Sequence, residues 1–394
     1  MKPPLILHCL DGLGIGGAER QLILLLRHLP RETFAHAVCH LGPRQDLAAP
    51  IRAMGIPVFD LSRGRRYSPI AVARLLLLVR RQRPALIHAD HDFGKFGARI
   101  AGALMRIPVL ATMGNTVAEP HAVPGRRRVS ARARLLDWAD RIVSDRTPHH
   151  YLAISQAVKR SLMDDGVLPD QISVVYRGVD PSDFVPDTPE RLSSLRRTLL
   201  PEGAGPILLN VGRLTEQKGQ DTLIRAMPVI LRLRPHARLV LVGEGPSRDA
   251  YLALARRKGV AGHVQLLGSR LDVPDLLQVA DVFVFPSRRE GFGCALLEAM
   301  AAGRPCVASR IPTLQEVMGT DGAGVLVPPG RPDLFAEAIL SLLEDPARRA
   351  LMGRRAREIV TERFDIGRSA LDFAELCHRV ISVGRARTPA EAVS

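Results

Sequence analysis

Short, almost wholly apolar segments alternate along this chain with longer segments whose apolar residues recur at helical spacing, and the alternation fills two successive blocks. Segments 206–211 and 238–242 hold hardly any polar residue, which is typical of parallel strands buried on both faces. Strand, helix and strand in succession form the unit of a doubly wound α/β sheet. Because one core rarely serves 394 residues, the pattern predicts two Rossmann-like domains that face a central cleft.

The domain boundary is expected between residues 180 and 191, where three prolines and four acidic residues interrupt the pattern. We therefore place an N-terminal domain at 1–185 and a C-terminal domain at 186–365, and expect the polar tail 385–394 to be disordered. The first block is expected to hold strands at 5–10, 35–41, 87–88, 108–112 and 172–176, and helices at 18–29, 70–83 and 94–105. The second is expected to hold strands at 206–211, 238–242, 264–267, 282–286, 305–308 and 325–327.

The apolar runs and the cysteines of the sequence indicate a cellular compartment. No apolar run approaches the 18 residues that a membrane-spanning helix needs, and the apolar start 5–10 is too short for a signal peptide. Five cysteines are scattered without a C-x-x-C pair, a pattern that suits a reducing compartment and no structural zinc. We therefore expect a cytoplasmic protein.

Positive charge is concentrated in one region. The net charge is +15, and residues 61–141 hold sixteen Lys/Arg against five Asp/Glu. Such a region attracts nucleic acid, anionic lipid or a pyrophosphate-linked substrate, or it is simply a solvated basic surface. Aromatic residues, which stack on single-stranded nucleic acid, make up only 4% of the chain. We expect no nucleic-acid partner and favour an anionic membrane surface that delivers a membrane-borne acceptor.

A glycine loop follows the first strand. Residues 12–17 match the G-x-G-x-x-G dinucleotide fingerprint, which suggests a nicotinamide-dependent oxidoreductase. That class also needs an acidic residue at the end of the second strand. Here the strand 35–41 ends without one, and the next acidic residue is Asp46, in the following loop. The oxidoreductase is therefore disfavoured. Gly16 and Gly17 would still let the backbone approach an anionic or sugar ligand at a helix N-terminus, unless the loop is only a tight turn.

The second block places two cations in one loop. Arg213 and Lys218 lie in the glycine-bounded segment 212–219, directly after an apolar strand. If both side chains faced one diphosphate, each charge-assisted hydrogen bond would contribute about 1.5–3 kcal/mol. Exposed cations in loops are common, so this feature alone is a moderate signal.

Two glutamates follow a later strand. Glu290 lies in a glycine-rich loop, and Glu298 is the only charge in the apolar stretch that follows Gly293. A lone carboxylate in such a stretch binds a ligand or forms a buried ion pair. Gly291 and Gly293 would leave the N-terminus of this helix open to a phosphate.

Four motifs together resemble retaining GT-B glycosyltransferases of the group 1, or family 4, class. Residues 16–20 resemble the family's N-terminal glycine motif, and 212–219 its donor-diphosphate motif. Glu290 and Glu298 match its E-x7-E pair, and 176–180 resembles the segment before its interdomain linker. The resemblance covers nearly the whole chain.

The resemblance implies a donor site for a nucleotide-diphosphate sugar. Arg213 and Lys218 would neutralise the leaving diphosphate without a metal or other cofactor, and the anomeric configuration would be retained. Glu290 would hold donor-sugar hydroxyls, Glu298 the ribose, and Arg270 would lie near the base. The remaining substrate-binding candidates are Gly16, Gly17, Gly291, Phe292, Gly293, Cys294, His88 and His91.

The family also implies an acceptor and a location. The acceptor would be lipid-linked or an oligosaccharide, in bacterial surface polysaccharide synthesis, with the enzyme peripheral at the inner membrane face. The last helix, 366–384, would return to the N-terminal domain.

Three positions depart from the family pattern. Gly114 stands where many members carry a histidine that contacts the donor sugar, Arg177 stands where an asparagine is usual, and 310–316 lacks the usual double glycine. A nucleotide-sugar-binding protein without transferase activity therefore stays open as an alternative.

His88 and His91 come at the end of a strand, where side chains can line a cleft. Asp90 and Asp92 lie among them and could instead cap the helix or, with His88, bind a metal. Because the second block already supplies positive charge for a diphosphate, we expect no metal.

Overall fold

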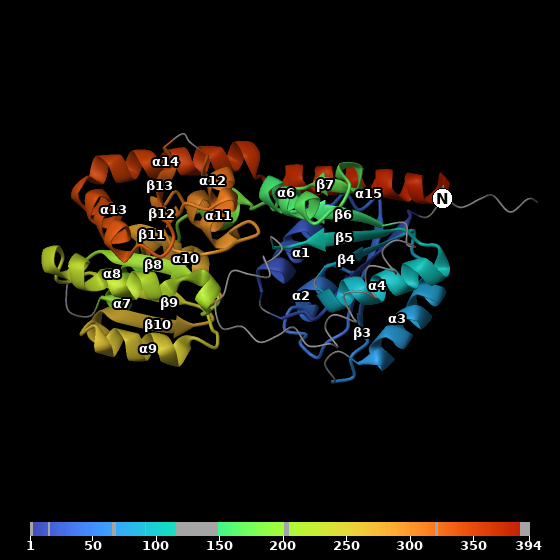
Figure 1. Cartoon of the computed structure of the whole chain (residues 1–394), viewed down its shortest axis with the longest axis horizontal. Coiled ribbons are helices and arrows are strands. Elements are labelled where there is room, and N and C mark those ends of the chain that lie inside the picture. The colour runs from blue at the N-terminus through green and yellow to red at the C-terminus, as the bar shows by residue number, and fades with distance from the viewer. Residues whose placement is uncertain are drawn as a thin grey trace, which may run out of the picture. The chain divides into compact units, whose positions relative to one another are not determined.

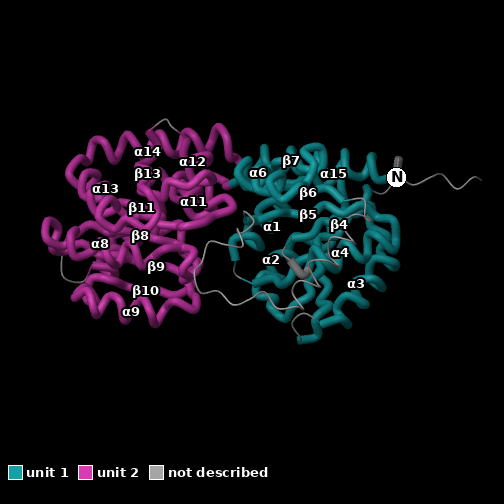
Figure 2. Tube along the Cα trace, viewed as in Figure 1, with its two compact units in different colours: residues 1–178, 366–394 teal, residues 179–365 magenta. Residues whose placement is uncertain are grey.

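The computed structural model describes residues 3–14, 16–64, 68–90, 92–115, 149–200, 205–319 and 322–386. The chain forms two compact units, and each holds one parallel sheet (Figure 2). Unit 1 comprises residues 1–178 and 366–394, and unit 2 comprises residues 179–365. The α/β class with two Rossmann-like sheets, predicted from the alternating pattern, is confirmed.

The sheet of unit 1 has the strand order β3-β2-β1-β4-β5-β6-β7 (Figure 1). The order reverses between β1 and β4, and at such a switch point the loops at the carboxyl ends of the strands diverge and leave room for a ligand. The strands are β1 (Leu5–Leu10), β2 (Ala35–His40), β3 (Val58–Asp60), β4 (Leu86–Ala89), β5 (Val109–Met113), β6 (His149–Ala153) and β7 (Ile172–Val174).

Helices cover this sheet and share its core. Leu7 and Ile87 of the sheet and Leu75 of a helix are fully buried together. The last helix of the chain packs on the first helix and on β4 and β5, so it belongs to unit 1. The helices are α1 (Gly17–His28), α2 (Ala48–Ala53), α3 (Pro69–Gln82), α4 (Asp92–Met105), α6 (Gln156–Asp164) and α15 (Ile366–Ala386), with a 3-10 turn η1 (Pro169–Gln171).

The sheet of unit 2 has the order β10-β9-β8-β11-β12-β13. Its strands are β8 (Ile207–Val211), β9 (Arg238–Val242), β10 (Val264–Gly268), β11 (Val282–Phe285), β12 (Cys306–Ser309) and β13 (Gly324–Val327). Its helices are α7 (Pro189–Leu199), α8 (Gln220–Leu233), α9 (Arg248–Arg257), α10 (Val273–Val279), α11 (Cys294–Ala301), α12 (Pro312–Met318), α13 (Pro332–Glu344) and α14 (Pro346–Arg363), with 3-10 turns η2 (Pro181–Phe184), η3 (Glu216–Lys218) and η4 (Ala261–His263).

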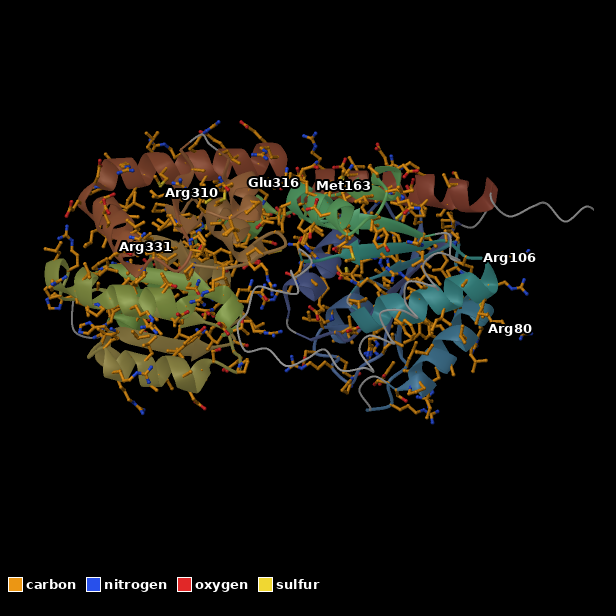
Figure 3. All side chains as sticks on the ribbon, viewed as in Figure 1. Arg80, Arg106, Met163, Arg310, Glu316 and Arg331 are labelled. Carbon is orange, nitrogen blue, oxygen red and sulfur yellow. The ribbon has the colours of Figure 1, made fainter. Side chains whose placement is uncertain are left out.

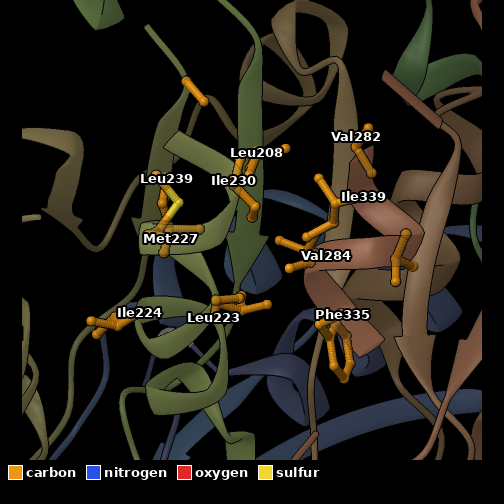
Figure 4. Close-up of a cluster of buried hydrophobic side chains, with 14 of the residues drawn as sticks. Leu208, Leu223, Ile224, Met227, Ile230, Leu239, Val282, Val284, Phe335 and Ile339 are labelled. Carbon is orange, nitrogen blue, oxygen red and sulfur yellow. The ribbon is translucent and has the colours of Figure 1, made fainter. Parts of the chain in front are cut away.

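The core of unit 2 lies between the sheet and the helices α8 and α13 (Figure 4). Leu208, Val282 and Val284 point into it from neighbouring strands, and Phe335 and Ile339 come from α13. Phe335 is fully buried. Burial of a side chain of this size stabilises the fold by about 1.5–3 kcal/mol.

Two strands of unit 1 were not anticipated from the sequence. β3 has only three residues, too few for a recognisable alternation. β6 begins with His149 and His150, so its apolar signal is confined to Tyr151, Leu152 and Ala153. Across the described part of the chain, none of the helices has the length and apolar character that crossing a membrane requires.

Candidate functional site

Two loops of unit 2 are joined at the carboxyl ends of adjacent strands. Because β8 pairs with β11, the segment after β8 lies beside the segment after β11. The backbone N–H of Arg288 donates to the carbonyl of Gln217 at 2.8 Å, and the Gln217 amide donates to the carbonyl of Arg289 at 3.0 Å. The Arg288 guanidinium also donates to Asp221 at 2.8 Å. These contacts hold the two loops in a fixed register.

Lys218 and Glu290 meet where the loops join. Lys218 Nζ lies 2.5 Å from Glu290 Oε1, and the Ser287 hydroxyl donates to the same oxygen at 2.7 Å. The Glu290 side chain is 6% exposed and that of Lys218 is 23% exposed. The structure thus brings together two of the three residues predicted to be catalytic. An ammonium group has three donors, so Lys218 can serve a further acceptor.

Gly219 makes this close approach of the two loops possible. Its φ is +68°, and a Cβ built on it would lie 2.2 Å from the carbonyl oxygen of Pro286. Any other residue would combine an unfavourable backbone conformation with a clash against main chain. Gly219 therefore sets the backbone position from which the Lys218 side chain reaches Glu290.

Arg213 is exposed at the other end of the same loop. Within the described part of the chain, no hydrogen bond or ion pair engages its guanidinium. The loop itself is braced, because Gln220 donates to the Arg213 carbonyl at 3.1 Å and the Tyr251 hydroxyl to that of Thr215 at 2.9 Å. Arg213 is thus an exposed cation on a braced loop.

The E-x7-E segment begins in the loop after β11 and ends in helix α11. Gly293 caps α11 with φ +92°, and Gly291 is buried beside it. The Phe292 ring is 2% exposed and packs edge-to-face on Phe364, so the ring belongs to the core. Glu298 and Cys294 are half-buried on α11. The apolar surroundings of Glu298 suggested deeper burial than the structure shows.

Arg270 follows β10 and is paired with Asp272. Its Nε and Nη2 donate to the two carboxylate oxygens at 2.7 and 2.5 Å. The pairing raises the pKa of Arg270 and lowers the pKa of Asp272. Contact between Arg270 and a base remains a prediction.

Glu244, which the sequence reasoning did not single out, belongs to the same edge of the sheet. It follows β9 between two glycines and is exposed. The Leu214 N–H donates to its carbonyl at 2.9 Å, and a Cβ on Gly243 would lie 2.3 Å from the Gly212 carbonyl oxygen. The signal that could have revealed it is a Gly-Glu-Gly run directly after an apolar strand.

The first glycine loop begins α1 in unit 1. Gly16 is the N-cap, and a Cβ there would lie 2.2 Å from a carboxylate oxygen of Glu19, which folds back over it. Nothing lies within 4 Å of a Cβ built on Gly17. A ligand role for Gly16 and Gly17 stays a prediction.

His88 belongs to a chain of buried hydrogen-bonding side chains. The register of β1 and β4 puts His8 opposite His88, and their Nδ1 atoms are 2.9 Å apart. His8 Nε2 is 3.1 Å from His36 Nδ1, and His88 Nε2 is 2.7 Å from the Thr112 hydroxyl. Burial lowers the pKa of His88 and of His36 to about 4, and that of His8 well below its usual value. These histidines are therefore neutral at pH 7.

The neighbours of His88 line a small pocket within unit 1, together with Thr112 and Phe373. In it, Arg177 Nη2 lies 3.5 Å from Asp90 Oδ2, and each of the two side chains is 12% exposed. Arg177, a departure from the family pattern, thus has a buried carboxylate partner. His91 lies outside the described residues. Among those described, no three His, Cys, Asp or Glu side chains are grouped as a metal site would require.

Gly114 follows β5 and leaves room for a side chain. No atom of the described residues lies within 4 Å of a Cβ built on it, and its φ is not in the left-handed region. Of the basic region 61–141, residues 65–67, 91 and 116–141 lie outside the described part of the chain.

Two family models match the chain in succession. Residues 15–183 match Glycosyltransferase Family 4, and residues 194–359 match Glycosyl transferases group 1. Each half of the chain thus matches a glycosyltransferase family model. The group 1 domain contains both joined loops, including Arg213, Lys218 and Glu290.

Several curated relatives of the chain are glycosyltransferases. A glycosyltransferase of Methanocaldococcus jannaschii is 36% identical over 54% of this chain and 55% of its own length. A D-inositol 3-phosphate glycosyltransferase of Kineococcus radiotolerans is 34% identical over 61% and 57%. A GDP-mannose-dependent phosphatidylinositol monomannoside mannosyltransferase of Corynebacterium glutamicum is 37% identical over 46% and 49%. The chain thus spans about half the length of the curated relatives it matches.

Solved structures share the whole fold. Anabaena HepE in complex with UDP-glucose has a TM-score of 0.82 at 23% identity, over 95% of this chain and 100% of that one. WaaG, a glycosyltransferase involved in lipopolysaccharide biosynthesis, has a TM-score of 0.75 at 17% identity, over 94% and 99%. At these identities the likeness establishes the GT-B fold.

Proposed function

We propose that this protein is a retaining, metal-independent glycosyltransferase that moves a sugar from a nucleotide-diphosphate sugar to a polysaccharide or glycolipid acceptor. The observation that carries the proposal is the joined pair of loops, in which Lys218 contacts Glu290 and Arg213 is exposed on the same loop. Positive charge held there would stabilise the diphosphate as it leaves.

The chemistry follows from where charge develops. The bond between the anomeric carbon and the diphosphate oxygen breaks, and negative charge accumulates on the departing group. Lys218 and Arg213 would bind this charge, which is the task that other transferases give to a metal ion. The acceptor hydroxyl attacks on the face that the diphosphate leaves, which retains the configuration, and its proton passes to the departing phosphate.

The carboxylates would select the donor. Glu290, which contacts Lys218 and Ser287, would accept hydrogen bonds from hydroxyls of the donor sugar, and Glu298 would accept them from the ribose. The backbone of 291–294, at the start of α11, would contact phosphate or sugar. The UDP-glucose in HepE and the GDP-mannose in the name of the C. glutamicum relative support a nucleotide-sugar donor.

The acceptor is proposed to be lipid-linked or an oligosaccharide, in bacterial surface polysaccharide synthesis at the cytoplasmic face of the membrane. The phosphatidylinositol acceptor named for the C. glutamicum relative and the lipopolysaccharide pathway named for WaaG support this class.

A thermal-unfolding panel with UDP, GDP, ADP and NADH, each with and without EDTA, tests the donor site. A ligand at about 100 times its dissociation constant adds roughly 2.7 kcal/mol to stability. We expect a shift with one nucleoside diphosphate, insensitive to EDTA and lost in Lys218→Ala. Lys258→Ala, which removes an exposed lysine just after α9, is the matched control and should keep the shift. A shift with NADH alone, or one abolished by EDTA, would refute the proposal.

A second candidate function follows from Gly114, which stands where many family members carry a histidine that contacts the donor sugar. The chain would then bind a nucleotide sugar without transferring it. Turnover separates the two, because a transferase releases nucleoside diphosphate in the presence of acceptor and a pure binder releases none. The anomeric configuration of the product, read by NMR, tests retention.

A further inference from the structure

The outer face of α3 carries apolar side chains where a surface helix usually presents polar ones. Ile70 is 52% exposed and Leu77 is 68% exposed, with exposed Ala73 between them. The spacings of three and four residues place the three on one stripe. The opposite face, including Leu75 and Val79, is fully buried in the core. Before its last turn, helix α3 therefore presents apolar side chains to the solvent as well as to the core.

Helix α4 packs beside α3 (Figure 1), and its two basic side chains are buried. Lys95 and Arg99 are 8% and 5% exposed, whereas Leu104 is 69% exposed. Phe96 and Ile100 are half-buried on the remaining surface of the helix. Helix α4, the neighbour of α3, thus also exposes a large apolar side chain near its C-terminal end, Leu104.

Arginines gather where the two helices end. Figure 3 shows Arg80 and Arg106 projecting from the ends of α3 and α4, and Arg81 and Arg83 are exposed beside them. Within the described residues, no ion pair or side-chain hydrogen bond engages any of the four. Helix α3 contains no acidic residue. Arginines at a helix C-terminus are favoured by the helix dipole, but the dipole does not account for exposed leucines next to them.

We propose that this surface, formed by Ile70, Leu77, Leu104, Arg80, Arg81 and Arg106 and called here the α3–α4 surface, binds an anionic lipid bilayer. Leucines would enter the boundary between headgroups and acyl chains, and arginines would bind lipid phosphates.

Other occupants fit less well. Nucleic acid would use the arginines but leave the leucines in contact with charged phosphate. A second copy of the chain in a two-fold contact would cover the leucines but bring the same arginines together, which is repulsive. An anionic bilayer satisfies both kinds of side chain at once.

The geometry gives the bound orientation of α3. From Ile70 to Leu77 the stripe covers about 10 Å along the helix axis, so α3 lies in the plane of the membrane. The α3–α4 surface would attach the enzyme to the membrane that holds the proposed lipid-linked acceptor. This proposal rests on the proposed function only for the identity of that acceptor. Vesicle binding needs no turnover, so the two can fail separately.

Co-sedimentation of the full chain with vesicles tests the proposal. We expect binding to phosphatidylcholine vesicles that contain phosphatidylglycerol, weak binding to pure phosphatidylcholine, and loss of binding at high salt. Arg80→Glu/Arg81→Glu should lower the partition coefficient at least about tenfold. Leu77→Gln/Leu104→Gln should lower it by a similar factor. Thermal unfolding verifies that each variant is folded, and either pair alone suffices for the test.

Matched controls lie on unit 2. Arg256→Glu/Arg257→Glu makes the same charge change at the last turn of α9, where both arginines are exposed. Leu351→Gln changes a leucine that is 62% exposed on α14. Both controls should bind like the original chain, and Lys218→Ala should too. The proposal is overturned if the original chain ignores anionic vesicles, if the α3–α4 variants bind as well as the controls, or if light scattering shows a dimer that the leucine variant abolishes.

Discussion

Replacing Gly219 by alanine tests the joined loops most directly. The residue has φ +68°, and its new methyl group would lie 2.2 Å from the Pro286 carbonyl oxygen. The loop after β8 must then move away from the loop after β11, and the contact between Lys218 and Glu290 must lengthen. The substitution should therefore cost both stability and nucleotide binding.

The magnitude separates into two parts. A non-glycine residue in the left-handed region costs about 1–2 kcal/mol, and forcing extra atoms into packed structure costs a further 1–3 kcal/mol or so. Gly259 provides the control for the first part, because its φ is +69° and nothing lies within 4 Å of its Cβ position. Gly259→Ala should thus lose roughly 1–2 kcal/mol, and Gly219→Ala roughly 1–3 kcal/mol more.

Urea denaturation of both variants, followed by circular dichroism, gives the two free energies. Titration with the nucleoside diphosphate that stabilises the original chain gives the binding loss, which should appear only in Gly219→Ala. Equal losses of unfolding free energy in the two variants would show that the close approach to Pro286 does not contribute to stability. Unchanged nucleotide affinity in Gly219→Ala would show that the joined loops are not part of the donor site.

Two further predictions concern unit 1. Gly114→His should change the free energy of unfolding by less than about 0.5 kcal/mol, because space is open around its Cβ position; a larger loss in urea denaturation would contradict this, and a rise in transfer rate would identify the missing histidine as what limits turnover. The free energy of unfolding should fall as pH is lowered from about 6.5 towards 4, because burial lowers the pKa of His88 to about 4 in the folded chain and the unfolded chain takes up the proton first. The loss from His88 alone would approach about 3 kcal/mol, and His88→Gln should give a flatter pH profile; a profile as steep as that of the original chain would exclude His88 as a source.

The fold could be anticipated because buried parallel strands leave an unusually plain signal. Segments such as 206–211 and 238–242 are apolar on both faces, and they became β8 and β9. β6 escaped notice because its first two residues are histidines. The order of the strands in each sheet could not be predicted either. Periodicity shows which face of a segment is buried, but it does not show which strand pairs with it.

The sequence supplied candidate residues for the site but not their arrangement. The types and spacing of Arg213 and Lys218 predicted a diphosphate site, and the family resemblance added Glu290. The contact between Lys218 and Glu290, 72 residues apart, depends on β8 and β11 being neighbours in the sheet. His88 was expected to line a cleft, but its hydrogen bonds to His8 and Thr112 come from strands that are paired only in the folded chain.

The place of α15 in unit 1 has a consequence for how the protein is made. Unit 2 is one continuous stretch, and its first and last residues, Val179 and Asp365, are bridged. Unit 1 needs α15, whose Phe373 ring covers the His88 ring at a centroid distance of 5.0 Å. Since synthesis runs from the N-terminus, the ribosome completes unit 2 before it supplies that cover. A chain that ends at residue 365 contains every residue of the second unit, but it lacks the helix that covers the histidine chain of the first.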